Sequence, residues 1–109
     1  MNPTSPLLAG TLDLLILKTL SLEAKHGWAI GKRIQQVSKD ALQVQQGSLY
    51  PALYRLERQG LIKSEWQTTD TGRKAKFYAL TRSGRKRLET ELENWARLSS
   101  AINMIIRMS

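Results

Sequence analysis

The sequence predicts a mainly α-helical protein with a small β-hairpin, arranged as a winged helix-turn-helix domain plus a long C-terminal helix. Two amphipathic helical patterns, over residues 28–37 and 46–60, follow each other across a polar connection. The pattern then changes to the alternation typical of strands over 61–67 and 74–81, and becomes helical again from 82 to about 108. Two helices followed by a strand pair is the element order of a winged helix-turn-helix domain.

The length of 109 residues corresponds to one small domain. We expect a flexible N-terminal arm over residues 1–10, a winged-helix domain over 11–81 and a dimerisation helix over 82–109. The chain contains no cysteine, which excludes disulfides and thiolate metal sites. Its longest aliphatic run, Leu14–Leu17, is far shorter than the roughly 20 apolar residues that span a bilayer. We therefore expect a cytoplasmic protein with no membrane partner, no metal and no cofactor.

Positive charge is concentrated in the second half of the predicted winged-helix domain. The net charge is +8, and positions 47 to 87 hold ten of the 17 basic residues but only three of the 9 acidic ones. A localised basic face is expected in a protein that binds a polyanion such as DNA. The alternative is a solvated surface that only keeps the protein soluble, and charge alone does not decide between them.

The first helical pattern, over residues 11–22, is apolar on two faces. A helix of this kind is usually buried on both sides. We expect one face to pack inside the domain and the other against a second chain. The two stripes consist of Leu12, Ile16 and Leu20 on one face, and Leu14 and Leu17 on the other.

The next pattern, over residues 28–37, has a single apolar stripe. Ile30, Ile34 and Val37 form this stripe, which leaves Lys32 and Arg33 for solvent. Trp28 falls opposite the stripe on an ideal helix. We therefore expect Trp28 to pack elsewhere, at the interface between subunits.

The segment Gln46–Leu61 combines a helix start signal, an amphipathic helix and a helix stop signal. Ser48 is the expected N-cap, Pro51 falls in the first turn, and Gly60 follows the last periodic residue. Such a helix, with one apolar face and a polar and basic one, suits the major groove of DNA. Its apolar face consists of Leu49, Leu53 and Leu56, and its remaining surface carries Ser48, Tyr50, Tyr54, Arg55 and Arg58.

A basic hairpin follows this helix. Residues 61–67 and 74–81 read as strands, and Asp70 and Gly72 supply the turn between them. We expect Trp66 to close the domain core beneath the hairpin. The basic residues of the hairpin are Lys63, Arg73, Lys74 and Lys76.

Thr81 is the expected N-cap of the long final helix. Its apolar residues are spaced as in a coiled coil, which predicts a seam for self-association. For Trp95, in the middle of this seam, we favour a place in the dimer core; the alternative is an aromatic wall of an effector pocket between subunits. The seam consists of Leu88, Leu92, Trp95, Ile102 and Ile106, with Ser99 in the gap and Leu98 and Ile105 beside it.

Three motifs resemble the PadR family of bacterial transcriptional regulators. They read H-G-W-A-I at 26–30, G-S-L-Y-P-A-L-Y-R-L-E-R-Q-G-L-I at 47–62, and G-R-K-A-K-F-Y-A-L-T-R-S-G-R at 72–85. The resemblance extends from about Leu8 to Leu98 and is to the short branch of the family, which has a single C-terminal helix. Relatives often have tyrosine where this chain has Trp28.

The resemblance implies a winged-helix homodimer, built through its first and last helices, that binds palindromic operator DNA and usually represses transcription. It also implies that a small aromatic or drug-like effector can release the DNA in some relatives. The alternative function is a winged-helix module that binds a protein partner through its basic face. No enzyme signal is present, because the sequence has neither a phosphate-binding glycine loop nor metal-ligand spacing, and His26 is the one histidine.

These patterns and the resemblance together give the candidate site residues. Arg58 could reach a phosphate or Glu65. We expect contacts with double-stranded DNA from Ser48, Tyr50, Tyr54, Arg55, Arg58, Lys32, Arg73, Lys74 and Lys76. We expect the dimer interface to contain Leu12, Leu14, Leu17, Leu88, Leu92, Trp95, Leu98, Ile102 and Ile106, and a candidate effector pocket to contain Trp28 and Trp95.

Overall fold

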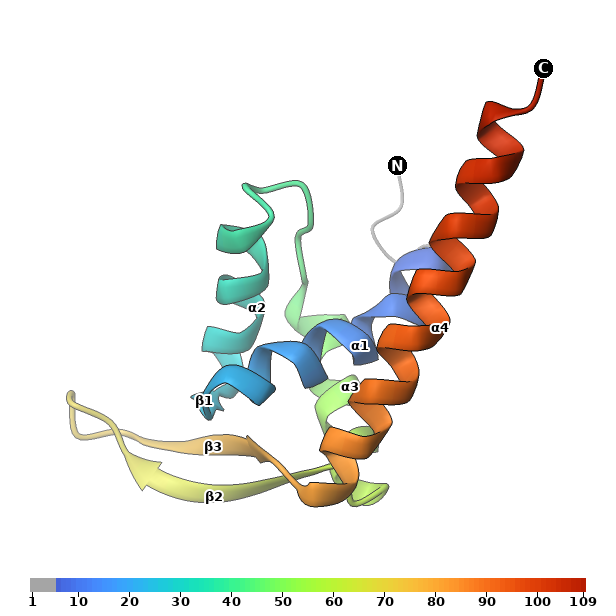
Figure 1. The fold of residues 1–109 in the computed structure, drawn as a ribbon. Helices are drawn as coiled ribbons and strands as arrows, with labels where there is room; N and C mark the ends of the chain where they lie inside the picture. Colours follow the sequence, from blue (N-terminus) through green and yellow to red (C-terminus); the bar gives the residue numbers. More distant parts are fainter. Residues whose placement is uncertain (1–5) are drawn as a thin grey trace.

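The computed structural model describes the backbone from residue 6 and the side chains from residue 11, in both cases to residue 109. Residues 6–109 form four helices and a three-stranded antiparallel sheet (Figure 1). This confirms the predicted fold class. The elements are α1 (Pro6–Leu22), β1 (Lys25–His26), α2 (Gly27–Val37), α3 (Gln46–Arg58), β2 (Ile62–Thr68), β3 (Lys74–Leu80) and α4 (Arg82–Arg107).

Helix α1 begins at Pro6, five residues before the predicted start at Thr11. A proline is compatible with the first turn of a helix, because its missing N–H would have no partner there. The prolines that suggested an arm over residues 1–10 therefore do not exclude a helix. The remainder of that predicted arm, residues 1–5, lies outside the described residues.

The core lies where α1, α2 and α3 meet the root of the sheet. Apolar residues from all these elements and from α4 are buried together. Helices α2 and α3 approach closely, since a Cβ on Gly31 would lie only 3.4 Å from Leu49 Cδ2. The expected stripes are mostly confirmed: Leu12, Ile16, Leu20, Ile30, Ile34, Leu49, Leu53 and Leu56 are all buried, whereas Val37 is exposed.

Helix α3 begins one turn earlier than expected at its N-terminus and ends as expected. Its N-cap is Gln45, so Ser48 lies inside the first turn and Pro51 inside the helix. At the other end, Gly60 has a φ of 75° and donates its N–H to the Glu57 carbonyl, while Leu61 donates to the Leu56 carbonyl. This pair of bonds is a Schellman motif, which requires the left-handed conformation that glycine adopts without strain.

The sheet contains one strand that the sequence pattern did not predict. The predicted hairpin is present as β2 and β3, and β1 pairs with the other edge of β3, giving the order β1-β3-β2. Strand β1 has two residues, Lys25 and His26, opposite Tyr78 and Phe77. Two residues are too few to show an alternating pattern, so no periodicity could predict them.

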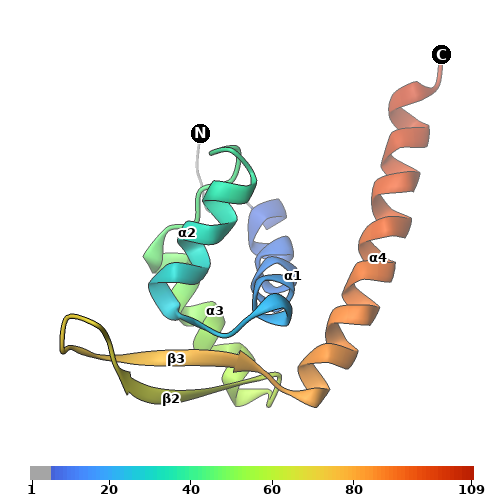
Figure 2. The ribbon, with the colours of Figure 1, turned by 60° about the vertical axis from the view of Figure 1, so that its left-hand side comes forward.

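Helix α4 is held at its N-terminal end and free at its C-terminal end. The Thr81 hydroxyl accepts the N–H of Gly84 at 3.0 Å, which confirms the predicted N-cap, and donates to the Gly60 carbonyl at 2.7 Å. Leu88 is buried in the core, whereas residues 101–109 are all exposed. Figure 2 shows the C-terminal half of α4 extending beyond the other helices. None of the helices within residues 6–109 is long and apolar enough to cross a membrane.

Candidate nucleic-acid interface

One face of α3 points away from the core. Gly47, Pro51, Tyr54 and Arg58 follow one another at helical spacing opposite the buried leucines, and all four are exposed. We call these four residues the α3 outer face. Gly47 and Pro51 were not among the predicted contacts, although the spacing of the leucines already places them opposite the buried stripe.

Tyr54 and Arg58 of the α3 outer face contact each other. The Arg58 guanidinium carbon lies 5.7 Å from the centre of the Tyr54 ring, a cation–π arrangement. Tyr54 is 63% exposed. Arg58 makes no ion pair with Glu65, the alternative partner, or with any other acid in the described residues. Its charge is therefore available to an external anion.

Tyr50 lies on the flank of α3 that faces α2 and the sheet. A Cβ on Gly27 would lie 3.0 Å from the Tyr50 ring, so the ring rests against the start of α2. Tyr50 is nevertheless 40% exposed. Tyr50 also lies near Tyr78. The pKa of Tyr78 is raised mainly by burial, and to a smaller extent by the charge of Glu57 and by Tyr50. Tyr50 thus combines a packed ring with an accessible edge beside the α3 outer face.

Two of the expected DNA contacts on α3 lie in surroundings that differ from those expected. Arg55 lies on the opposite flank, where its guanidinium donates to the carboxylate of Asp13 in α1. Ser48 is half-buried and does not cap the helix, because the helix begins two residues before it. Asp13 lies 42 residues before Arg55 in the sequence, so local spacing could not predict this pair.

The hairpin carries the predicted cations at its exposed end. Arg73, Lys74 and Lys76 are exposed, and none of them makes an ion pair among the described residues. The hairpin is tied to α3 at its root, where the Ser64 hydroxyl donates to the Glu57 carboxylate at 2.6 Å. Figure 2 shows β2 and β3 extending past the helices, so the turn projects beyond the body of the domain.

Trp66 does not close the core, which corrects the expectation. It is 64% exposed, because its position on β2 lies beyond the helices that cover the root of the hairpin. Its ring instead contacts the Lys76 ammonium, which lies 5.8 Å from the ring centre.

Helix α2 contributes Lys32 and Trp28 on one exposed side. The two residues are four apart and therefore share a face of the helix, while Arg33 lies on another face. Trp28 is 53% exposed and stacks on His26, with ring centres 6.1 Å apart. His26 and Phe77 of β3 make a T-shaped contact, with ring centres 4.9 Å apart.

Helix α4 presents the predicted apolar seam to solvent. Leu92, Trp95, Leu98, Ile102 and Ile106 are between 42% and 71% exposed in the single chain. Leu14 of α1 is half-buried. Three other residues predicted at the interface are already enclosed by their own chain: Leu12, Leu17 and Leu88, with exposures of 4%, 0% and 7%.

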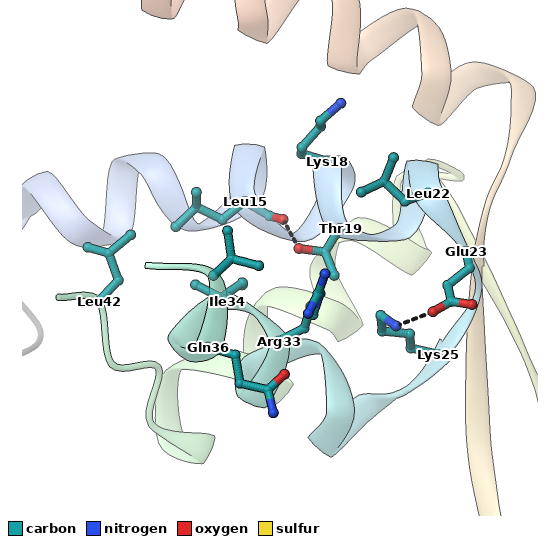
Figure 3. Close-up of a pocket in the computed structure, with 11 residues that line it drawn as sticks. Leu15, Lys18, Thr19, Leu22, Glu23, Lys25, Arg33, Ile34, Gln36 and Leu42 are labelled. Atoms are coloured by element: carbon teal, nitrogen blue, oxygen red, sulfur yellow. Dashed lines mark hydrogen bonds and ion pairs between the residues drawn. The ribbon is translucent and has the colours of Figure 1, made fainter. Parts of the chain in front are cut away.

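A groove between α1 and α2 lies away from both predicted pocket tryptophans. It has a volume of about 770 Å³, with Leu15, Ile34 and Leu42 among its apolar lining residues (Figure 3). Lys18, Arg33 and the Lys25–Glu23 ion pair, 2.7 Å long, also line it. Trp28 and Trp95 do not line this groove and do not contact each other. A single chain therefore does not assemble the predicted effector pocket.

The residues that the structure describes contain no group of three or more His, Cys, Asp or Glu side chains placed to hold a metal ion. What they present is a helix surface, a basic hairpin and an apolar seam. Surfaces of this kind bind macromolecules.

Comparison with known proteins gives the family. The model of the "Transcriptional regulator PadR-like family" matches residues 16–90. The uncharacterized protein X of Lysinibacillus sphaericus is 26% identical over 102 residues, 94% of either chain. The transcriptional regulator Rv3488 of Mycobacterium tuberculosis is 41% identical over 66 residues, which cover 58% of this chain and 61% of that protein.

Solved structures show the same fold along almost the whole chain. A transcriptional regulator from Clostridium thermocellum aligns with a TM-score of 0.86 at 28% identity, over 94% of this chain and 100% of the other. A PadR family transcription regulator from Clostridium difficile R20291 aligns with a TM-score of 0.76 at 30% identity, over 89% and 99%. The chain belongs to the PadR-like family of transcriptional regulators, so it is a DNA-binding regulator and not an enzyme.

Proposed function

We propose that the protein is a homodimeric repressor that binds a palindromic operator, with α3 of each chain in a major groove and the hairpin on the neighbouring backbone. The observation that carries the proposal is the α3 outer face. It is exposed, carries Tyr54 and Arg58, and lies beside a hairpin whose exposed cations make no ion pair among the described residues.

Different residues would perform different parts of recognition. Contacts to base edges usually come from the N-terminal part of a recognition helix, where Ser48 and Tyr50 lie. Arg58, in the last turn of α3, and Arg73, Lys74 and Lys76 of the hairpin would contact phosphates, which provide affinity but no sequence information. Lys32 of α2 is a further phosphate contact in this proposal.

The exposed seam of α4 supports a dimer. A row of half-exposed large apolar side chains is unfavourable in water and stable when a second copy covers it. A twofold dimer would present two α3 helices to one side of the DNA. If they occupy successive major grooves, their centres would be about 34–36 Å apart, one turn of the duplex. A palindromic operator follows from this symmetry.

The test is binding to DNA from upstream of the protein's own gene. We expect this DNA to bind more tightly than scrambled DNA of equal length at physiological salt, and the affinity to fall steeply as salt increases. Footprinting should protect two halves of a palindrome. Equal affinity for both DNAs would contradict the proposal. A reporter under the same promoter should be expressed more strongly when the regulator is absent, and a fall in expression would contradict repression.

Two arginine substitutions test whether the α3 outer face contacts DNA. Arg58→Ala removes one cation from the α3 outer face, and Arg97→Ala removes one from the exposed side of α4 opposite the seam. We expect the first variant to reduce the slope of log affinity against log salt by about 1.8, which is about 0.9 for each of the two copies in the dimer, and the second to leave it unchanged. If both variants bind the operator as the wild type does, Arg58 is not a DNA contact.

A small aromatic effector is the second part of the proposal. Trp95 lies in the α4 seam and is 42% exposed, so in a dimer it could line a pocket between the two chains. We expect planar aromatic compounds to quench tryptophan fluorescence and to weaken operator binding. The same response from a Trp95→Ala protein would remove Trp95 from the pocket. Trp28 enters this pocket only if the partner chain brings it near.

A further inference from the structure

We propose that Trp66 is a DNA contact of the hairpin, with its ring packed against a sugar or base at the edge of a groove. The inference rests on the proposed DNA-binding function and adds to it a contact that does not depend on charge. The sequence pattern assigned Trp66 to the core, and the structure places it on an exposed and cationic surface.

The register of the hairpin shows which face carries Trp66. Trp66 pairs with Lys76, the preceding pair on the same face is Ser64 with Tyr78, and the pair before that is Ile62 with Leu80. Ile62 and Tyr78 are buried in the core. Trp66 therefore continues, beyond the helices, the same face of the sheet that packs against them at its root.

Strand alternation also separates the charges of the hairpin. The next pair outward on the Trp66 face is Thr68 with Lys74. Glu65 is adjacent to Trp66 in sequence and therefore points to the opposite face. The extended part of the Trp66 face thus presents one large aromatic ring and two lysines, with no carboxylate of either strand.

This face is continuous with α3. The Ser64 hydroxyl donates to Glu57 of α3 at 2.6 Å, and Tyr78 beside it lies near Tyr50. The ring of Trp66 is therefore held by a strand that is fixed to the recognition helix. The Lys76 ammonium, 5.8 Å from the ring centre, restricts the ring further.

The chemistry of this surface fits DNA. Phosphates would contact Lys74 and Lys76, and the apolar faces of sugars and bases would pack on the indole. An acidic protein surface would satisfy the two lysines but would leave the tryptophan ring in contact with charged groups. We therefore commit to DNA and make a protein partner an outcome of the test.

The test measures operator affinity over a salt series for the full-length protein. Aromatic stacking on a nucleic acid is independent of counterions, so Trp66→Ala should lower affinity roughly 5- to 150-fold for each of the two copies in the dimer, at every salt concentration and without changing the salt slope. Trp66→Phe should recover most of the loss. Lys74→Ala should instead reduce the slope by about 1.8, which is about 0.9 per copy in the dimer, and Lys63→Ala, a cation on the other face of the same hairpin, should not.

Fluorescence gives an independent reading. In a protein carrying Trp28→Phe and Trp95→Phe, Trp66 is the remaining tryptophan, and we expect operator DNA to quench it. Because Trp66 is exposed, Trp66→Ala should leave the urea midpoint of unfolding nearly unchanged.

The outcomes separate the two proposals. If the wild type binds its operator and Trp66→Ala binds equally well, the inference about Trp66 is wrong and the proposed function stands. If the wild type shows no preference for its operator, both are wrong. A normal DNA affinity of Trp66→Ala with loss of a protein partner would assign the ring to that partner.

Discussion

The guanidinium of Arg55 in α3 donates a hydrogen bond to the carboxylate of Asp13 in α1. The two residues join the helix that carries the α3 outer face to the first helix of the domain. An arginine that local spacing assigned to DNA thus has a partner within its own chain. The ion pair therefore helps to fix the orientation of α3, and with it the α3 outer face, relative to α1.

We predict that this ion pair orients α3 more than it stabilises the fold. The Arg55 and Asp13 side chains are 49% and 30% exposed, and exposed pairs usually contribute about 0.2–1 kcal/mol. A double-mutant cycle with Arg55→Ala and Asp13→Ala, measured by urea unfolding, should give a coupling in that range. Arg55→Ala should also reduce the salt slope of operator binding less than Arg58→Ala does. An equal reduction of the salt slope would show that Arg55 also contacts a phosphate.

Gly84→Ala should be severely destabilising. A Cβ at this position would lie 2.0 Å from the Leu61 carbonyl oxygen and 2.6 Å from Leu80 Cδ1, and the carbonyl belongs to the backbone and cannot move aside. We expect a loss of about 3 kcal/mol or more in the free energy of unfolding. Gly47→Ala is the control, because a Cβ there meets nothing within 4 Å. It should be neutral or stabilise by up to about 1 kcal/mol.

Tyr78 should make the protein less stable at alkaline pH. Burial, the charge of Glu57 and the nearby Tyr50 raise the pKa of Tyr78 above its ordinary value. The folded state therefore favours the neutral phenol, whereas the unfolded chain ionises from about pH 10. The contribution is fully present below pH 10 and is lost as pH rises above it.

Urea unfolding between pH 8 and pH 11 measures this contribution. The fall in unfolding free energy above pH 10 should be smaller in Tyr78→Phe than in the wild type. Tyr54→Phe is the matched control, because it removes the same hydroxyl from an exposed ring. Identical profiles for wild type and Tyr78→Phe would be evidence against the assignment.

A charge in the α4 seam should produce monomers. Ile102→Asp places a carboxylate among side chains that we propose to be covered by a second chain, and burying an unpaired charge is strongly unfavourable. Ser100→Asp, two residues earlier, places the same group on the opposite and exposed side of the helix. In light scattering coupled to gel filtration, Ser100→Asp should remain a dimer and Ile102→Asp should be a monomer. If Ile102→Asp remains a dimer, another surface forms the interface.

Features that depend on residues close together in the sequence were predicted correctly. The leucine stripe of α3, the cap at Thr81 and the turn between β2 and β3 all depend on groups within a few positions of one another. The starts of α1 and α3 were predicted less accurately. Helix α1 begins at Pro6, earlier than expected, and Pro51 lies inside α3 because that helix also begins earlier than expected. Strand β1 is too short to carry a pattern at all.

By itself, the sequence determined the winged helix-turn-helix order, the basic hairpin and the apolar seam of α4, because periodicity and local charge specify each of them. Only the tertiary structure decided which side chains remain available for contacts. It paired Arg55 with Asp13, enclosed Leu17 and exposed Trp66, since each of these outcomes depends on groups that are distant in the chain. Burial and pairing are properties of the assembled packing, and no local spacing encodes them.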